Sequence, residues 1–151
     1  MTENPMFKHL LISTDGSSLG NKAAKAGIEL AQALGAKVTA YYAIEQLQIY
    51  DEGYMMDQQM IDRLEESARA AGQKRVDAIG KMAKAAGVPF VSVMMTQAST
   101  AYEGIIDAAK KRKCDVIFMA SHGRRGLSRL MMGSLTQKVL AYSRIPVVVY
   151  R

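Results

Sequence analysis

The sequence predicts an α/β protein in which helices cover both faces of a parallel β-sheet. Apolar runs of strand length alternate with longer segments of helical periodicity, and turn or cap residues separate most of them. The chain has 151 residues, 49% of them apolar and 23% charged, which is typical of a globular protein. We therefore expect a single domain over residues 1–151. No apolar run approaches the ~20 residues that a membrane-spanning helix needs.

The first strand and helix are separated by a clear turn. Residues 9–15 form an apolar run, which predicts a buried strand. The following Asp15-Gly16-Ser17-Ser18 cluster predicts a turn and a helix cap. Residues 19–34 have apolar positions at helical spacing, and Gly35 is typical of a left-handed helix end. Residues 38–44 then predict the second strand.

A long helix is predicted over residues 58–86. Gly87 ends it, and Pro89 prevents its continuation. Residues 88–95 predict the third strand. The helix should bury one apolar stripe against the sheet, made of Ile61, Leu64, Ala68, Val76, Ile79 and Ala83.

The last part of the chain repeats the same alternation. Thr100-Ala101-Tyr102-Glu103 is a capping box that opens a helix ending in the basic cluster 110–113. Residues 115–120 predict the fourth strand. Ser134-Leu135-Thr136-Gln137 is a second possible capping box, opening a helix to about residue 142. Residues 146–150 predict a short final strand.

The basic residues are concentrated in the last third of the chain. The formal net charge is +6, from 20 basic and 14 acidic side chains. Residues 1–100 are nearly balanced, whereas residues 101–151 contain ten basic and three acidic residues. Such an excess attracts phosphate groups. A nucleotide and a nucleic acid both fit the charge, but no helix-turn-helix or zinc-finger pattern supports nucleic acid binding.

A loop rich in glycine and arginine is predicted between the fourth strand and the last helix. Gly123 and Gly133 allow a close backbone approach to an anion. The Gly133-Ser134 step opens a helix, and the free N–H groups of a helix start favour phosphate. The loop therefore predicts a polyphosphate site, although the same residues also suit an ordinary loop with solvated arginines.

At this loop the chain resembles the universal stress protein family. Nucleotide-binding members of that family have the pattern G-2x-G-9x-G-(S/T). Gly123, nine further residues and Gly133-Ser134 match its later part, while Ala120 stands where the first glycine is expected. The resemblance covers almost the whole chain, from Ser13-Thr14-Asp15 to Pro146-Val147-Val148-Val149.

The resemblance implies a three-layer αβα fold, Rossmann-like and of the adenine nucleotide alpha hydrolase-like type. Its five-stranded parallel sheet would have the strand order 3-2-1-4-5. In that order the final strand is an edge, and an apolar edge tends to pair with another chain. Both this argument and the resemblance predict a homodimer through residues 147–150.

The resemblance also implies ATP as the ligand, either alone or with Mg²⁺. Asp15 would lie beside the ribose and phosphates, although it can equally begin an Asx turn. The backbone of Ala43 would contact adenine. The other residues that the resemblance places at the nucleotide are Met119, Ala120, Gly123, Arg124, Gly133, Ser134, Leu135 and Thr136.

Ala120 decides between two versions of the function. We expect a small regulatory protein that binds ATP with little or no hydrolysis, and not an enzyme. At the end of a strand φ is normally negative, so the extra methyl should weaken binding rather than abolish it. The alternative is a nucleotide-free family member that acts only as a dimeric interaction module.

Other classes of function fit the sequence less well. A phosphorylation receiver needs an acid at the end of the third strand, and residues 93–97 contain none. A Gly-Lys-Ser/Thr phosphate loop does not occur. His122 is expected to be a hydrogen-bonding loop residue rather than a catalytic one. Cys114 is the single cysteine, expected to be buried, and the lack of an internal disulfide favours the cytoplasm. The sequence identifies no downstream partner.

Overall fold

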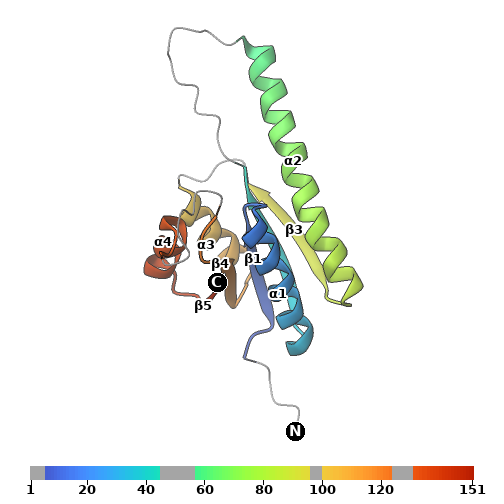
Figure 1. Cartoon of the computed structure of the whole chain (residues 1–151), viewed down its shortest axis with the longest axis vertical. Coiled ribbons are helices and arrows are strands. Elements are labelled where there is room, and N and C mark those ends of the chain that lie inside the picture. The colour runs from blue at the N-terminus through green and yellow to red at the C-terminus, as the bar shows by residue number, and fades with distance from the viewer. Residues whose placement is uncertain (1–5, 45–56, 96–99, 124–130) are drawn as a thin grey trace.

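The computed structural model describes residues 6–44, 57–95, 100–123 and 131–151. Strands and helices alternate as the periodicity predicts (Figure 1). In chain order the elements are β1 (His9–Thr14), α1 (Ser18–Leu34), β2 (Lys37–Ala43), α2 (Gln58–Ala85), β3 (Phe90–Met95), α3 (Ala101–Lys111), β4 (Val116–Ala120), α4 (Ser134–Tyr142) and β5 (Val147–Tyr150). In the described part of the chain, no helix is long and apolar enough to cross a membrane.

The strands form one parallel sheet in the order β3-β2-β1-β4-β5, which confirms the predicted topology. Thr14 at the end of β1 lies level with Tyr42 of β2. Ile12 of β1 lies level with Phe118 of β4. Because the strands are parallel, all of them end at one edge of the sheet, and the segments that follow them meet there.

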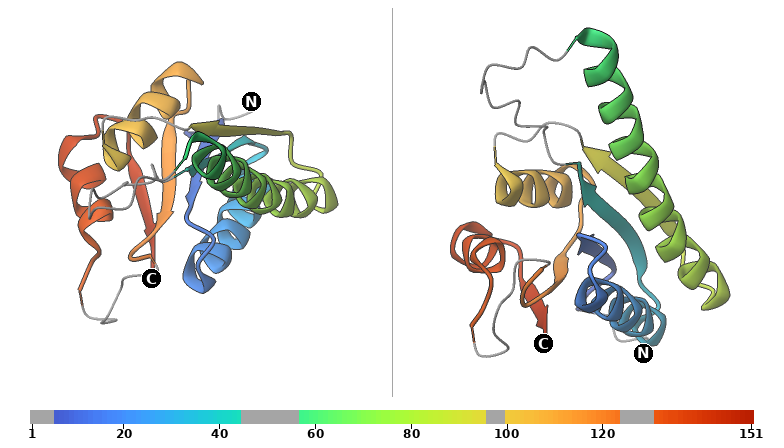
Figure 2. Two further views of the ribbon diagram at one scale, coloured as in Figure 1. Left: turned by 90° about the horizontal axis from the view of Figure 1, so that it is seen from above. Right: turned by 45° about the horizontal axis from the view of Figure 1, so that its top comes forward.

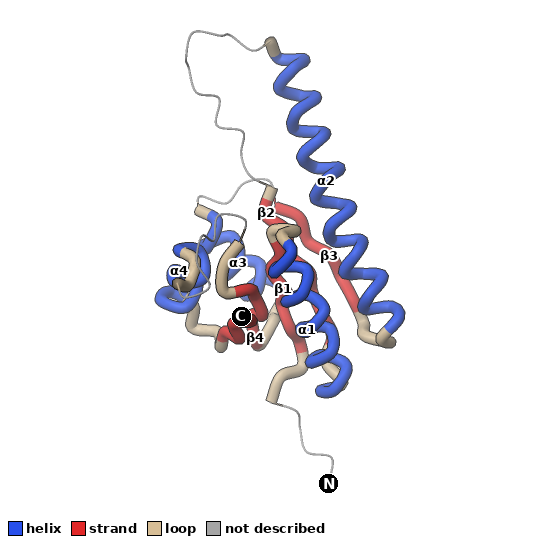
Figure 3. Tube along the Cα trace, viewed as in Figure 1, coloured by secondary structure: helices blue, strands red, loops and turns tan. Residues whose placement is uncertain are grey.

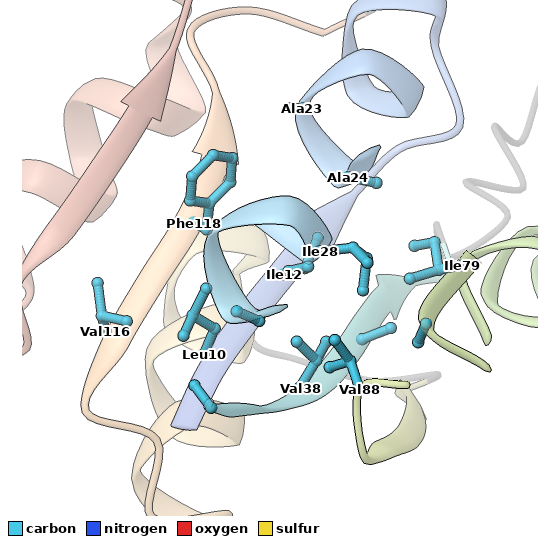
Figure 4. Packing of buried hydrophobic residues seen from close by; sticks show 14 of the residues in the cluster. Leu10, Ile12, Ala23, Ala24, Ile28, Val38, Ile79, Val88, Val116 and Phe118 are labelled. Carbon is cyan, nitrogen blue, oxygen red and sulfur yellow. The ribbon is translucent and has the colours of Figure 1, made fainter. Parts of the chain in front are cut away.

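Two helices cover each face of the sheet (Figure 2). One core cluster lies between the sheet and the helices α1 and α2, and includes Leu10, Ile12 and Ile28 (Figure 4). The other lies beneath α3 and α4, and includes Leu11 and Val139. The side chains of β1 alternate between these clusters, so this central strand is buried on both faces.

Local cap residues set the ends of α1 and the start of α3. Ser17 caps α1, with its Oγ accepting the N–H of Gly20 at 3.0 Å. Gly35 ends that helix with a φ of 65°, the left-handed conformation that glycine adopts without steric cost. Thr100 caps α3, with its Oγ1 accepting the N–H of Glu103 at 3.4 Å. These local signals explain why the boundaries were readable in the sequence.

The start of α4 differs from the predicted capping box. Gly133, not Ser134, is the N-cap, and no side chain caps the helix. Gln137 instead donates its Nε2 to the carbonyl of Met132 at 2.7 Å. A glycine is acceptable at this position but offers no acceptor to the first N–H groups. The predicted cap was therefore wrong, and α4 begins without side-chain capping.

α2 is longer than the surface that it covers. Val76, Ile79 and Ala83 are buried as predicted, at 2% exposure or less. Leu64 is 37% exposed, and Ile61 and Ala68, from the same predicted stripe, are only half-buried. In Figure 3 the N-terminal part of the helix extends past the end of the sheet. Periodicity predicted the helix, but it does not reveal how far the sheet beneath it reaches.

Candidate functional site

The edge where the strands end brings several predicted site residues together. Ile12 of β1 pairs with Phe118 of β4. Asp15 and Ala120 therefore stand at the ends of adjacent strands. Ala43 is the last residue of β2, on the other side of β1. Parallel α/β sheets bind ligands at this edge.

A compact turn holds Asp15 at that edge. The N–H of Ser17 donates to Asp15 Oδ1 at 2.9 Å, which is the Asx turn that the sequence allows. The N–H of Gly16 donates to Thr14 Oγ1 at 3.1 Å. Gly16 has a φ of 72°, so the turn needs glycine at this position. The carboxylate is thus fixed by the start of α1.

Gly123 brings the loop after β4 against this carboxylate. A Cβ placed on Gly123 would overlap Oδ2 of Asp15, so only a glycine allows this approach. Gly20 packs on the other carboxylate oxygen, since a Cβ there would lie 2.7 Å from Asp15 Oδ1. The two glycines explain how the backbone of two different segments can surround one carboxylate.

Both ends of the loop are fastened to the end of β4. The N–H of Gly133 donates to the carbonyl of Ser121 at 2.7 Å. The hydroxyl of Thr136 donates to the carbonyl of Ala120 at 2.9 Å. His122 has the hydrogen-bonding role expected of it, with its Nδ1 3.1 Å from Ser121 Oγ. Residues 124–130, and with them the predicted contact of Arg124, lie outside the described residues.

The first turn of α4 presents a hydroxyl and backbone N–H groups to this edge. Ser134 is exposed and follows the uncapped Gly133. Leu135 packs against the cluster beneath α3 and α4, and Thr136 is 2% exposed. Met119, also predicted at the nucleotide, has its side chain in the same cluster. An anion could therefore meet Ser134 Oγ and the N–H groups of this turn.

Ala120 fits its position without backbone strain. Among the described residues other than glycine, Lys113 alone has a positive φ. The side chain of Ala120 packs against the cluster between the sheet and the helices α1 and α2. Its partly buried side chain therefore contacts the core, and the backbone strain that would have argued against alanine is absent.

Arg75 on α2 was missed by the sequence analysis. Its guanidinium lies against Gly16, where it occupies the space that a Cβ would take. The guanidinium carbon also lies 5.8 Å from the centre of the Tyr42 ring. Its neighbour Val76 was recognised from the apolar stripe, but a charged residue beside that stripe gave no signal of its own.

Part of the positive charge of the last third lies at the edge of the sheet opposite the candidate site. The basic residues 110–113 lie in the last turn of α3 and just after it, and Asp115 beyond them accepts the N–H of His9 at 3.1 Å, at the start of β1. Arg112 and Lys37 line a cavity of about 280 Å³ at this edge. Residues 110–113 therefore cannot contribute their charge to a phosphate site at the opposite edge, although they belong to the excess that the sequence analysis associated with phosphate groups. Over the described ranges, no group of three or more His, Cys, Asp or Glu side chains is arranged to hold a metal ion.

Comparison with known proteins gives a consistent family. The model of the universal stress protein family matches residues 6–151. A universal stress protein of Thermus aquaticus, named for its position in the 3′ region of the QAH/OAS sulfhydrylase, is 32% identical over 146 residues. That match covers 97% of this chain and 100% of the relative.

Two solved structures share the fold. MJ0577 of Methanocaldococcus jannaschii, solved as a hypothetical protein for structure-based assignment of its biochemical function, superposes with a TM-score of 0.80 at 23% identity over 95% of each chain. A universal stress protein solved in complex with cAMP gives a TM-score of 0.70 at 20% identity, over 97% of this chain and 98% of that one. At these identities the two structures establish the fold alone.

Proposed function

Because this chain belongs to the universal stress protein family, we propose that it binds ATP at the carboxyl edge of its sheet, as a cytoplasmic regulatory protein with little or no hydrolysis. The observation that carries the proposal is the contact of the Gly123 backbone with the Asp15 carboxylate. One residue before Gly123 is His122, on which the uncapped start of α4 packs through Gly133. A nucleotide needs acceptors for its ribose hydroxyls and N–H donors for its phosphates. The cAMP complex of a structural neighbour supports an adenine nucleotide as the ligand class.

Each part of the nucleotide has a proposed partner. Asp15 accepts hydrogen bonds from the ribose, and the backbone of Ala43 contacts the adenine edge. The phosphates meet the backbone from Gly123 onward and the hydroxyl of Ser134, with Arg124 adding a charge-assisted contact. The glycines fit a phosphate cradle, because a Cβ on Gly133 would already lie 3.2 Å from His122 Cα. Mg²⁺ would arrive with the triphosphate.

The proposal of slow or absent hydrolysis rests on the arrangement of the titratable groups. Efficient hydrolysis needs a group placed to activate water. Asp15 accepts the N–H of Ser17 and packs on two glycines. His122 is engaged with Ser121. These contacts suit a binding role. We expect turnover of ATP below about one per minute, which corresponds to an activation free energy of more than ~20 kcal/mol.

Isothermal titration with ATP and Mg²⁺ tests the proposal. Wild-type protein should bind, and Asp15→Ala should bind at least tenfold more weakly, since about 1.4 kcal/mol of ribose contacts is lost. Asp107→Ala is the matched control, because Asp107 is an exposed acid on α3. Mass spectrometry of nucleotide released from freshly purified protein identifies the natural ligand. Equal dissociation constants for ATP in the wild type and Asp15→Ala would refute the site.

The alternative is the nucleotide-free interaction module, and Ala120→Gly separates it from ATP binding. Because Ala120 is unstrained and packs on the core, we expect the wild type to bind already and the variant to gain less than about threefold, or 0.7 kcal/mol. No heat with either protein at high-micromolar ATP would favour the module. A large gain in the variant alone would identify the methyl group as the obstacle.

We also propose that the protein is a homodimer paired through β5. This strand is one edge of the sheet, and its residues are partly exposed. The carbonyls of Pro146 and Tyr150 accept N–H groups at the start and end of β4. Since ladder contacts alternate along a strand, the backbone groups of Val149 point outward. Sedimentation should show a dimer for Val149→Ala and a monomer of about 16 kDa for Val149→Pro, which lacks that N–H. A monomeric wild type at micromolar concentration would refute the pairing.

A further inference from the structure

The side chain of Arg75 reaches from α2 to the edge where the candidate site lies. Its guanidinium rests on Gly16, the residue next to Asp15. It also lies over the ring of Tyr42, the residue next to Ala43. One side chain therefore contacts the neighbours of the two residues proposed to hold ribose and adenine.

The environment of this guanidinium is unusual for a structural arginine. Its Nε is buried without a hydrogen-bond partner among the described residues. A buried donor without a partner costs free energy. The packing of the guanidinium on Gly16 and its contact with the Tyr42 ring favour this position in spite of that cost. The left-handed φ of Gly16 and the lack of a Cβ are what leave room for it.

We propose that Arg75 is a positioning residue that fixes the spacing between the ribose side and the adenine side of the site. The inference rests on the proposed function, because it assigns a role within that nucleotide site. Arg75 holds the Gly16 turn from behind, and the same turn orients Asp15 through the Ser17 N–H. A site that is already ordered needs less ordering when the ligand binds, so less of the binding free energy is lost.

The position of Arg75 separates this role from that of a phosphate ligand. Tyr42 belongs to the cluster between the sheet and the helices α1 and α2. Leu135, in the first turn of α4, belongs to the cluster on the opposite face. The guanidinium therefore lies on the face of the sheet opposite to the first turn of α4, whose N–H groups and Ser134 hydroxyl are proposed for the phosphates.

Titration of Arg75→Met with adenosine and with ATP tests the proposal. We expect both ligands to bind about three- to tenfold more weakly, by similar factors, because the nucleoside half of the site is loosened. Arg69→Met is the matched control, since Arg69 is an exposed arginine of the same helix. If Arg75→Met does not fold, Arg75→Lys replaces it, because lysine keeps the charge but not the planar group.

Amide hydrogen exchange of Ser17 gives a readout that needs no ligand. In Arg75→Met its protection should fall, because the Asx turn is no longer held, and in Arg69→Met it should not. Unchanged exchange, or unchanged binding of both ligands, would overturn the proposal. A loss for ATP with none for adenosine would make Arg75 a phosphate ligand and equally overturn it. If the wild type binds no nucleotide, the proposed function fails, and the exchange of Ser17 still decides whether Arg75 holds the turn.

Discussion

Replacing Thr136 by valine tests whether its hydroxyl fastens the loop or serves a ligand. The hydroxyl is buried and donates to the carbonyl of Ala120, 16 residues earlier. Valine has nearly the same shape but leaves that carbonyl without this donor. Losing one such hydrogen bond to a part-buried carbonyl costs about 1–3 kcal/mol. In a chain of 151 residues this corresponds to a fall in Tm of roughly 2–10 °C.

Urea unfolding of the ligand-free protein measures the effect, with Thr136→Ser as the control. Serine keeps the donor and loses one buried methyl, so it should cost only about 0.8 kcal/mol. Titration with ATP then shows whether affinity falls with stability. If ligand-free Thr136→Val is as stable as the wild type, the contact with Ala120 contributes nothing to stability. A loss of ATP affinity in that stable protein would then make Thr136 a ligand contact.

Three further predictions concern the rest of the fold. Burial, and to a lesser extent the nearby charge of Lys37, lowers the pKa of His9 below 6.5 in the folded protein. Because the unfolded chain then binds the proton more readily, the free energy of unfolding should fall as the pH drops below about 6.5. His9→Gln should flatten that slope in urea titrations between pH 7 and 5.5, and an unchanged slope would contradict the assignment. Burial raises the pKa of the Cys114 thiol to about 11, so a thiol reagent at pH 8 should react slowly with the native protein and fully after unfolding. Rapid reaction of the native protein would contradict the burial of this thiol. Gly27→Val should lower the free energy of unfolding by about 1–3 kcal/mol in urea, because a Cβ there would lie 2.8 Å from Ile12 Cδ1; a variant as stable as the wild type would show that α1 can shift.

The sequence predicted the elements well wherever local chemistry determines them. Ser17, Gly35 and Thr100 begin or end helices through contacts within a few residues. Gly35 and Thr100 were predicted as caps, and Ser17 belongs to the predicted cluster of turn and cap residues. The capping box at Ser134 failed because its alternative, Gly133, is set by a hydrogen bond to Ser121, twelve residues away. Strand order came from the family resemblance, since alternation alone gives the class and not the neighbours.

The candidate site was less predictable because its geometry depends on distant contacts. Asp15 and Gly123 were both singled out, but only the fold shows that they touch. Arg75 could not be found, because its partners Gly16 and Tyr42 come from two other segments. The charge excess was misleading for the same reason: residues 110–113 count toward the last third but lie at the opposite edge of the sheet.

The strand order also sets the sequence of events while the chain is being made. β1 pairs with β4 in the middle of the sheet, yet Leu10 and its partner Val116 are more than 100 residues apart. The first three strands, with α1 and α2, can associate once Met95 has left the ribosome, but one edge of β1 and the face under Leu11 then remain uncovered. About 25 further residues must follow before Ala120 completes β4, an interval of roughly 1–5 s at ordinary synthesis rates. During those seconds the nascent chain exposes an apolar strand edge that surface residues of the finished protein cannot protect. A ribosome stalled between α2 and β4 should therefore leave an aggregation-prone fragment.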